Sequence, residues 1–566
     1  MILPILQIFT LLTTTIFLID DITLATAFVS RRSSRLSIFR QDVVLSGMYN
    51  DQCDVAIMGG GFGGLYTALA ISREAKKKGR KVDIALVDNS DRFVFLPLLY
   101  DLTVGTASEG EVCPTYDELL EGTGVRFIKA SFDSFNGDSC SGSVLKTGGS
   151  EQKYVLEEKP KEEDDDNSDT INLYFQASVV SVGATPQSIL SLIPGATEYV
   201  QPFYTREDAY ATRELLFRMD QRIQQGHCPR LAIVGGGYGG VELAACVARR
   251  LPKAKVTLIS RGRPMAGTRA EPLVDQALNK LGVVCEICSV DEIKKNTNGQ
   301  ITIQRRSNLN GSSLTPIDAE DEWDAVLWTA GSLPAYPVTK NENMDGLALS
   351  SSGRLIVDET LRCSFSTEDS KAMPSVWALG DCCEIIPVVQ PVPPKTAQAA
   401  IQQADVVASN VLAKLFNQES DTKVFKFQDL GSMLSLGGPN GAILGPKEDT
   451  QLGSLLVPLI DTARIGFGIA DSLFAQIINS SDIDKKVVEN LGLSIGGYGL
   501  GVDPESTPGT LSGTLSGASR RAIYALRMPT NKQRAVAGAS AFISSAAALA
   551  KEASDQIQSS NNSEKG

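Results

Sequence analysis

The sequence predicts an α/β protein with two Rossmann-like domains, followed by a C-terminal region of different composition. The first observation is an internal repeat, since VAIMGGGFGGLYTA at residues 55–68 returns as LAIVGGGYGGVELA at residues 231–244. The second is that each copy opens a strand–turn–helix–strand pattern, ending in VDIALVD and in KVTLIS. Apolar runs that alternate in this way with helical segments are typical of parallel sheets covered by helices.

Both copies of the repeat contain the pattern Gly-x-Gly-x-x-Gly at a strand-to-helix turn. The first glycine permits a tight turn, the second lets a pyrophosphate approach the backbone, and the third lets the helix pack closely on the strand. The N terminus of the helix then faces the phosphates with its unpaired N–H groups. Two such matches predict two dinucleotide sites, with these binding residues: Gly59, Gly61, Gly63 and Gly64 in the first copy, and Gly235, Gly237 and Gly240 in the second.

The residues at the ends of the second strands distinguish the two sites. Asp88 ends the run VDIALVD, at the position from which a carboxylate binds the hydroxyls of an adenosine ribose. The equivalent run KVTLIS ends in Ser260 and is followed by Arg261. An arginine in place of the acid favours the 2′-phosphate of NADPH at the second site, with NADH as the alternative. The competing interpretation is that Arg261 is an exposed loop charge.

The composition excludes several other kinds of chemistry. The net charge of −13 argues against nucleic acid as a partner, because phosphate binding needs a clustered basic surface. The single histidine, His227, rules out histidine-based triads, and no metal site is predicted because the commonest ligand is missing. The ten cysteines are scattered and suggest no disulfide framework. We interpret CEIC at residues 285–288 as buried strand cysteines, and we favour free thiols over a strained disulfide at Cys382 and Cys383.

Six motifs in a fixed order resemble type II NAD(P)H dehydrogenases, also called alternative NAD(P)H:quinone oxidoreductases. They are GGGFGGLYTA, FVFLPLLYDLTVG, GGGYGGVELA, LWTAGSLP, ALGDC and KTAQAAIQQ. FQDLGSMLSLG and YALRMPTNKQRAVAGASAF are most similar to the plastid and cyanobacterial branch, whose plant members reduce demethylphylloquinone. The resemblance implies a two-dinucleotide-binding flavoprotein fold, with FAD at the first site and NAD(P)H at the second. It also implies transfer of two electrons to a membrane quinone, demethylphylloquinone or plastoquinone, without proton pumping.

Further cofactor residues lie after later strand runs. Gly183 and Gly331 end the runs LYFQASVVSVG and EWDAVLWTAG, which close the two nucleotide-binding units in the same way. Gly380 and Asp381 follow a short apolar strand in ALGDC. The resemblance implies that this glycine–aspartate pair holds the ribityl chain of FAD.

Three residues are candidates for a catalytic role through the resemblance. Glu242 follows the last glycine of the second turn, and the resemblance places it beside the nicotinamide and the flavin. Its competing interpretation is a first-turn acid that favours the helix dipole. Gln398 and Gln402 are one helical turn apart and so share a face. The resemblance places them beside the quinone channel, and the competing interpretation is a polar helix face.

Two other functions remain open at this point. One is a soluble flavoprotein reductase that serves a protein acceptor, and the other is a non-catalytic, NAD(P)H-sensing flavoprotein. No Cys-x-x-x-x-Cys pair follows the first glycine turn, which is consistent with direct reduction of an acceptor by the flavin. A membrane-docking segment near the C terminus favours the quinone, and the sequence leaves a homodimer open.

The N-terminal residues predict import into a plastid. Residues 1–27 are largely apolar and end in Ala-Thr-Ala, which is typical of a signal-peptidase site, and a membrane anchor is the competing interpretation. Residues 28–50 are rich in arginine and serine and have the composition of a transit peptide. The combination resembles the bipartite presequence of algae with secondary plastids, and we favour it over simple secretion.

The C-terminal region predicts peripheral attachment to a membrane. Residues 519–534 carry five basic and no acidic residues, and the uncharged run at residues 535–550 is too short for a confident membrane span. A basic, apolar-faced segment in the lipid interface fits better, on thylakoids or plastid lipid droplets. The competing interpretation is a hairpin packed on the surface of the protein itself.

These observations predict the following division of the chain. It consists of the signal peptide at 1–27, the transit-like segment at 28–50, the FAD-binding domain at 51–200 and 346–416, the NAD(P)H-binding domain at 201–345, and the quinone- and membrane-docking region at 417–566, with a flexible insertion at about 466–518.

Overall fold

The computed structural model describes residues 49–132, 134–136, 139–143, 170–185, 190–307, 315–316, 321–335, 346–366, 375–437, 441–445 and 510–541. Residues 47–566 belong to one compact unit. The predicted presequence lies outside the described residues apart from residues 49 and 50, and so does most of the predicted flexible insertion.

The first sheet carries the first glycine turn. Its parallel strands run in the order β3 (Val125–Lys129), β2 (Ile84–Asp88), β1 (Tyr49–Met58), β6 (Thr170–Val180), and β18 (Ser375–Ala378) also pairs with β6. The hairpin β4 (Ser134–Asn136) and β5 (Ser139–Ser143) extends it in antiparallel fashion. Val55, Ile57 and Met58 are fully buried, as expected for a strand inside a parallel sheet. Because β18 completes this sheet, the chain returns to it after forming the second one.

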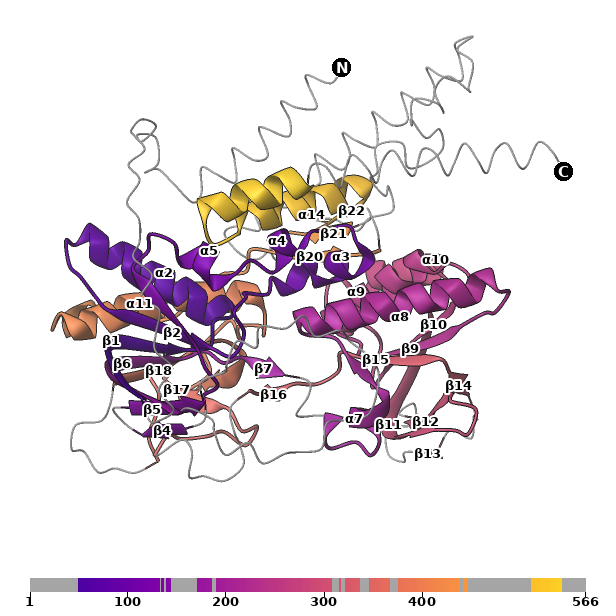
Figure 1. Cartoon of the computed structure of the whole chain (residues 1–566), viewed down its shortest axis with the longest axis horizontal. Helices are drawn as coiled ribbons and strands as arrows, with labels where there is room; N and C mark the ends of the chain where they lie inside the picture. Colours follow the sequence, from indigo (N-terminus) through magenta and orange to yellow (C-terminus); the bar gives the residue numbers. More distant parts are fainter. Residues whose placement is uncertain are drawn as a thin grey trace, which may run out of the picture. The chain divides into compact units, whose positions relative to one another are not determined.

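The second sheet carries the second glycine turn (Figure 1). Its strands run in the order β13 (Thr315–Pro316), β12 (Ile301–Ser307), β11 (Val284–Lys295), β10 (Lys255–Ser260), β9 (Arg230–Val234), β15 (Ala325–Trp328) and β8 (Gln201–Pro202), and β14 (Glu322–Trp323) pairs with β12. Strands β8, β15, β9, β10 and the start of β11 are parallel. The predicted α/β class with two parallel sheets is therefore confirmed.

Helices follow the strands as the sequence pattern predicts. The two glycine turns lead into α2 (Phe62–Lys77) and α9 (Tyr238–Arg250), and α2 packs against α11 (Ala397–Leu415). Helix α8 (Arg206–Gln224) begins at a capping box between Thr205 and Asp208, in which each side chain accepts a backbone N–H of the other. The remaining helices are α3 (Leu99–Val104), α4 (Glu109–Val112), α5 (Tyr116–Leu120), α7 (Ala196–Tyr199) and α10 (Glu271–Lys280), with short 3₁₀ turns η1 (Leu96–Leu98), η2 (Gly380–Cys382) and η3 (Glu419–Asp421).

Two short strands pair where the chain passes between the sheets. They are β7 (Ala184–Thr185) and β16 (Leu333–Pro334), which run antiparallel, with Leu333 opposite Thr185. A second small pair, β17 (Leu355–Val357) and β19 (Cys383–Ile385), runs parallel. The β7–β16 pair brings the ends of the two nucleotide-binding units together.

The C-terminal residues form a small sheet and a helix. The sheet has the order β20 (Ser432–Ser435), β21 (Gly441–Leu444), β22 (Thr510–Gly513), and α14 (Thr514–Leu526) follows directly. A further helical stretch covers residues 531–541. Of the predicted flexible insertion at about 466–518, the structure describes residues 510–518, which form β22 and the start of α14. None of the described helices is both long and apolar enough to cross a membrane.

The lipid-facing assignment of the C-terminal basic segment is partly wrong. Arg520 and Arg521 are buried, because each guanidinium group pairs with a carboxylate beneath α14, and Met528 is fully buried as well. The competing interpretation, a segment packed on the protein itself, describes this part of the structure. Lys532 and Arg534 of this segment stay exposed, as does Val536 just after it.

Candidate active site

The first glycine turn is shaped by backbone contacts that leave no room for side chains. Gly59 has a φ of +95°, and a Cβ atom there would lie 2.4 Å from the carbonyl oxygen of Ser181. A Cβ at Gly64 would lie 1.8 Å from the carbonyl oxygen of Gly59 itself. At Gly63 it would meet Ser181 Oγ at 2.2 Å. Helix α2 can therefore start directly over the end of β1 only with glycine at these positions.

The second glycine turn repeats this geometry closely. Gly235 has a φ of +134°, and a Cβ there would lie 2.3 Å from Thr329 Oγ1. A Cβ at Gly240 would lie 1.7 Å from the carbonyl oxygen of Gly235. The third glycine of each turn thus meets the first in the same way, so the sequence repeat is also a structural repeat.

The second glycine of each turn faces open space. Gly61 and Gly237 are the N-cap residues of α2 and α9, neither helix has a side-chain cap, and a Cβ at either glycine would meet nothing within 4 Å. A helix N terminus with unpaired N–H groups and an open approach is the arrangement that binds a pyrophosphate. Both turns therefore fit a dinucleotide.

The acid that follows the first turn contacts the turn itself. Asp88 Oδ2 accepts a hydrogen bond from the Gly60 N–H at 2.6 Å, and Oδ1 accepts one from the Ser90 N–H at 2.8 Å. Burial raises the pKa of Asp88, while these N–H groups act in the opposite direction. The carboxylate is thus fixed beside the glycine turn, where an adenosine ribose would lie.

The corresponding position after the second turn is different. Ser260 is buried, and its hydroxyl donates to the carbonyl oxygen of Gly262 at 2.5 Å. Arg261 is exposed. Because Arg261 is exposed and follows the small Ser260, its position is compatible with both interpretations, a contact to the 2′-phosphate of NADPH and a simple charge on a loop.

The strand-ending glycines lie at the link between the two units. Gly183 and Gly331 both have a φ of +68°, and the Ala335 N–H donates to the Gly183 carbonyl oxygen at 3.2 Å.

Arg354, which was not predicted from the sequence, donates from Nε to the carbonyl oxygen of Asp381 at 3.1 Å. Its position in a turn of SSGRLIVD gave no recognisable signal. Arg354 holds the Gly380–Asp381 turn from the side of β17.

The Gly380–Asp381 turn is also held by a glutamine of α11. The Gly380 N–H donates to Gln403 Oε1 at 2.8 Å, and Gln403 is buried. Gln398 and Gln402 were predicted because they share a helix face, and Gln403, which lies on the neighbouring face, was not. Burial raises the pKa of Asp381. The only sequence signal for Gln403 was its place next to Gln402.

Gln398 and Gln402 both bind the backbone of the segment that leads into β20. Gln398 Nε2 donates to the Gly431 carbonyl oxygen at 3.0 Å. Gln402 donates to the Gln428 carbonyl oxygen at 2.8 Å and accepts from the Gln428 N–H at 2.9 Å. The two amides thus fix residues 428–431 against α11.

Glu242 is buried and lies just after the first turn of α9. Its Oε1 accepts a hydrogen bond from the Ser435 N–H at 2.7 Å, so β20 holds the carboxyl group. Burial raises the pKa of Glu242 from its ordinary value of 4.5 to about 8, although the nearby Arg520 acts to lower it. Burial thus favours the protonated form of Glu242, and Arg520 favours the charged form.

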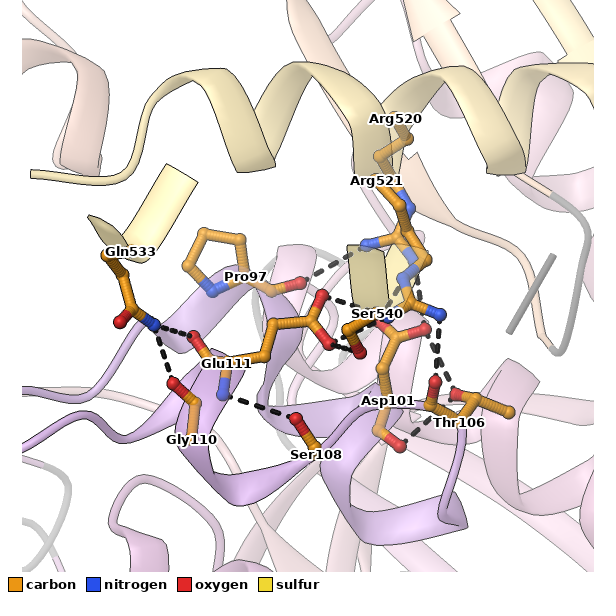
Figure 2. Close-up of polar contacts among 10 residues, drawn as sticks. All are labelled: Pro97, Asp101, Thr106, Ser108, Gly110, Glu111, Arg520, Arg521, Gln533 and Ser540. Carbon is orange, nitrogen blue, oxygen red and sulfur yellow. Dashed lines mark hydrogen bonds and ion pairs between the residues drawn. The ribbon is translucent and has the colours of Figure 1, made fainter. Parts of the chain in front are cut away.

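A group of residues around Glu242 was not predicted from the sequence. Arg520 Nη2 donates to both carboxylate oxygens of Asp101, at 3.2 and 2.9 Å, and Nη1 donates to the Pro97 carbonyl oxygen at 3.2 Å (Figure 2). Tyr100, next to Asp101 in α3, places its hydroxyl oxygen 3.3 Å from the position of a Cβ at Gly239. The group therefore lies at the N terminus of α9, beside the second glycine turn.

The described cysteines are all free thiols, and no group of potential metal ligands occurs among the described residues. Free thiols are confirmed at Cys382 and Cys383. In CEIC, Cys288 is buried as predicted, but the prediction is wrong for Cys285, which is exposed. The reason is that β12 pairs with β11 only from Cys288 onward, so the first residues of β11 lack a neighbour on that side.

Comparisons with known proteins agree with this geometry. A family model described as pyridine nucleotide-disulphide oxidoreductase matches residues 53–404. The alternative NAD(P)H-ubiquinone oxidoreductase C1, chloroplastic/mitochondrial, of Arabidopsis thaliana is 32% identical over 410 residues, which cover 70% of this chain and 73% of that protein. The demethylphylloquinone reductase NdbB of a Synechocystis strain is 32% identical over 396 residues, covering 69% of this chain and 86% of that protein. The structure of NDH2 from Plasmodium falciparum in complex with NADH has the same fold, with a TM-score of 0.52 at 17% identity, covering 72% of this chain and 94% of that one.

Proposed function

The chain belongs to the pyridine nucleotide-disulphide oxidoreductase family, and we propose that it is a type II enzyme of that family, which passes two electrons from NAD(P)H through FAD to a quinone. The observation that carries the proposal is the pair of matching glycine turns in one chain, each with a helix N terminus open to a pyrophosphate. The relatives that are 32% identical are named as quinone reductases, which favours a quinone over a protein acceptor.

FAD is proposed for the first turn. Gly61 and the N terminus of α2 would bind the pyrophosphate, Asp88 the adenosine ribose, and Asp381 the ribityl chain. The bound flavin supplies the chemistry, since it accepts a hydride from the nicotinamide and passes the electrons on. Arg354 and Gln403 would keep the Gly380–Asp381 turn in place for this contact.

NADPH is proposed for the second turn, with NADH as the alternative. Gly237 and the N terminus of α9 would bind the pyrophosphate. The exposed Arg261, after the small Ser260, would pair with the 2′-phosphate. Glu242 lies just after the first turn of the same helix, so a nicotinamide bound there would lie near its carboxyl group.

The quinone is proposed to meet the flavin near α11. Gln398 and Gln402 fix the segment 428–431, and the same segment leads to Ser435, which holds Glu242. The candidate residues for the two half-reactions are thus connected through β20. Demethylphylloquinone or plastoquinone is the proposed substrate, because of the names of the relatives and the chloroplast among their locations.

Peripheral attachment to a plastid membrane is proposed as well. The exposed residues of the last described segment, Lys532, Arg534 and Val536, offer basic and apolar groups to an anionic lipid surface. A bipartite presequence and a homodimer stay predictions.

Steady-state turnover tests the function. The mature protein is assayed with NADPH and NADH against plastoquinone and naphthoquinone analogues, and against a ferredoxin as a protein acceptor. We expect rapid quinone reduction with either coenzyme and slow reduction of the ferredoxin. Rapid reduction of the flavin that is followed by no transfer to any quinone would contradict the proposal and favour a sensor.

A further inference from the structure

Quinone reduction by NAD(P)H needs one proton from outside the coenzyme. A quinone takes up two electrons and two protons to become a quinol, and the hydride of NAD(P)H supplies both electrons and one proton. The net reaction is NAD(P)H + H⁺ + quinone → NAD(P)⁺ + quinol. In the proposed function, the second proton reaches the acceptor from water through a protein group, and Glu242 is the buried carboxyl group beside the second glycine turn.

We propose that Arg520 is a positioning residue for this proton step, because its ion pair with Asp101 sets the charge around Glu242 and so the pH at which Glu242 takes up and releases a proton. The proposal rests on the proposed function for the proton's destination. Its structural part rests on two links between Glu242 and the C-terminal helix: β20, which donates the Ser435 N–H to Glu242 and packs against α14, and the Arg520–Asp101 pair, which joins α14 to the α3 helix that packs on α9.

Three elements from distant parts of the chain surround Glu242. The backbone of β20 donates the Ser435 N–H to the carboxylate, and β20 pairs with β21, which pairs with β22. Helix α14 follows β22 directly and carries Arg520. Helix α3 carries Asp101, and α3 packs against α9. The C-terminal segment therefore supplies two parts of these surroundings. One is β22, which pairs with β21, the neighbour of β20. The other is Arg520, the cation that acts on Glu242.

The Arg520–Asp101 pair is built to stay in place. Arg520 is 1% exposed and Asp101 is 3% exposed, and Arg520 also donates to the Pro97 carbonyl oxygen. The guanidinium carbon lies 5.5 Å from the centre of the Tyr524 ring, one turn along α14. Two opposite charges that are buried and close together are largely shielded from salt and act strongly on a neighbouring carboxyl group.

The titratable and charged groups that act on Glu242 come from all of these elements. Helix α3 contributes Asp101, α14 contributes Arg520, and β20 contributes the Ser435 N–H. Tyr100 of α3, Tyr524 of α14 and Cys246 of α9 are in turn acted on by Glu242. Burial is the main cause that raises the pKa of Glu242, Arg520 lowers it, and Asp101 raises it. Because the two charges act in opposite directions, removing one or the other has opposite consequences.

The test uses this opposition. Arg520→Gln removes the cation and should raise the pH at which Glu242 titrates. Asp101→Asn removes the anion and should lower it. The double variant R520Q/D101N should titrate between the two single variants, and R520K should titrate near the wild-type pH because it keeps the charge. Each single change is expected to move the titration by about one pH unit or more, as for charges close to a buried carboxyl group.

A matched control lies one residue away. Arg521 is also buried in α14 and pairs with Glu111, but neither is among the groups that act on Glu242. The double variant R521Q/E111Q removes an ion pair of the same kind from the same helix. R521Q/E111Q should leave the pH at which Glu242 titrates unchanged. If this control shifts that pH as well, the shift comes from a loosened α14 and not from the charge of Arg520.

Two readouts are needed. The first is the infrared band of the protonated carboxyl group that disappears in Glu242→Gln, followed against pH in the FAD-loaded protein. The second is the pH profile of quinone reduction after the enzyme has been reduced with NADPH. Opposite shifts of R520Q and D101N in both readouts, with an unshifted R521Q/E111Q, support the proposal. Shifts in the same direction, no shift, or an equal shift in the control overturn it.

The two proposals fail in distinguishable ways. Quinone reduction with unshifted profiles overturns the role of Arg520 and leaves the proposed function standing. A wild-type protein that reduces no quinone overturns the proposed function, and the infrared titration then still decides whether Arg520 and Asp101 control the proton on Glu242.

Discussion

Glu111 and Arg521 form an ion pair across 410 residues of sequence, in which Arg521 Nη2 donates to both oxygens of a fully buried carboxylate at 2.8 and 2.9 Å (Figure 2). The hydroxyl of Ser540 also donates to this carboxylate, and Gln533 Nε2 donates to the Gly110 carbonyl oxygen at 2.6 Å. The C-terminal segment is thus attached to α4 by a buried ion pair and by partly buried hydrogen bonds. Deleting the C-terminal segment would leave the buried carboxylate of Glu111 without its partner Arg521, so the function of the segment is better tested by substitution.

Breaking this ion pair on one side should destabilise the protein strongly. Glu111→Gln leaves Arg521 buried without its counter-charge, which costs about 3–5 kcal/mol for a buried pair. Arg521→Gln should cost a similar amount, and the double variant should cost less than either single one. Urea unfolding and limited proteolysis of the C-terminal segment measure this. Single variants that unfold like the wild type would show that the pair contributes no stability.

Alanine at the second glycine of each turn should remove one nucleotide and leave the fold intact. At Gly61 and Gly237 the new methyl group has free space in the protein, but it occupies the approach of a pyrophosphate. Gly61→Ala should release FAD, whereas Gly237→Ala should keep FAD and weaken NAD(P)H binding at least tenfold. Flavin absorbance and coenzyme titrations, with thermal unfolding as the fold control, check this. In contrast, Gly240→Ala should misfold, because its Cβ would lie 1.7 Å from a carbonyl oxygen.

Coenzyme preference should depend on Arg261. Arg261→Asp should invert a preference for NADPH, because an acid repels the 2′-phosphate and accepts a hydrogen bond from a free ribose hydroxyl. Arg263→Asp is the control, since Arg263 is an exposed arginine two residues further along, whose guanidinium group pairs with Asp275 at 2.5 Å. The measurement is the ratio of kcat/KM for NADPH and NADH. An unchanged ratio in the Arg261 variant would show that another residue selects the coenzyme.

The stability of the protein should fall with rising pH in a way that depends on Glu242. The folded-state pKa of about 8 lies above the ordinary 4.5, so the protonated carboxyl group contributes stability in full below pH 4.5. That contribution is lost as pH rises to about 8, with a slope of at most about 1.4 kcal/mol per pH unit. Glu242→Gln lacks this titration, so its stability should drop less between pH 5 and pH 8. Urea unfolding at several pH values tests this, and parallel curves would contradict it.

Membrane binding should depend on the exposed residues of the last described segment. Lys532→Glu with Val536→Asp should reduce binding to vesicles that contain anionic lipid, because it removes a basic and an apolar contact. The side chain of Lys532 is 67% exposed and Val536 is 42% exposed, so the fold should tolerate both changes. Lys294→Glu with Val284→Asp, at exposed positions of β11, is the matched control. Equal vesicle binding by the two double variants would argue against this docking surface.

The sequence by itself determined the parts of the fold that depend on local backbone geometry. The glycine turns were predictable because a positive φ at Gly59 and the contact between Gly64 and Gly59 exclude side chains within a few residues of one another. The alternation of apolar runs with helical segments predicted the two parallel sheets for the same local reason. Asp88 was predictable as well, because its place is fixed by the end of the strand that follows the turn.

The tertiary structure alone decided which distant residues meet. The basic residues near the C terminus suggested a lipid-facing surface, yet Arg520 and Arg521 are buried against Asp101 and Glu111. A sequence pattern encodes the conformation of a segment and the face that it buries. It does not encode the partner of a charged side chain more than 400 residues away, because that depends on how α14 packs on α3 and α4. The surroundings of Glu242 followed from that packing, since β20, α3 and α14 meet around it only in the folded chain.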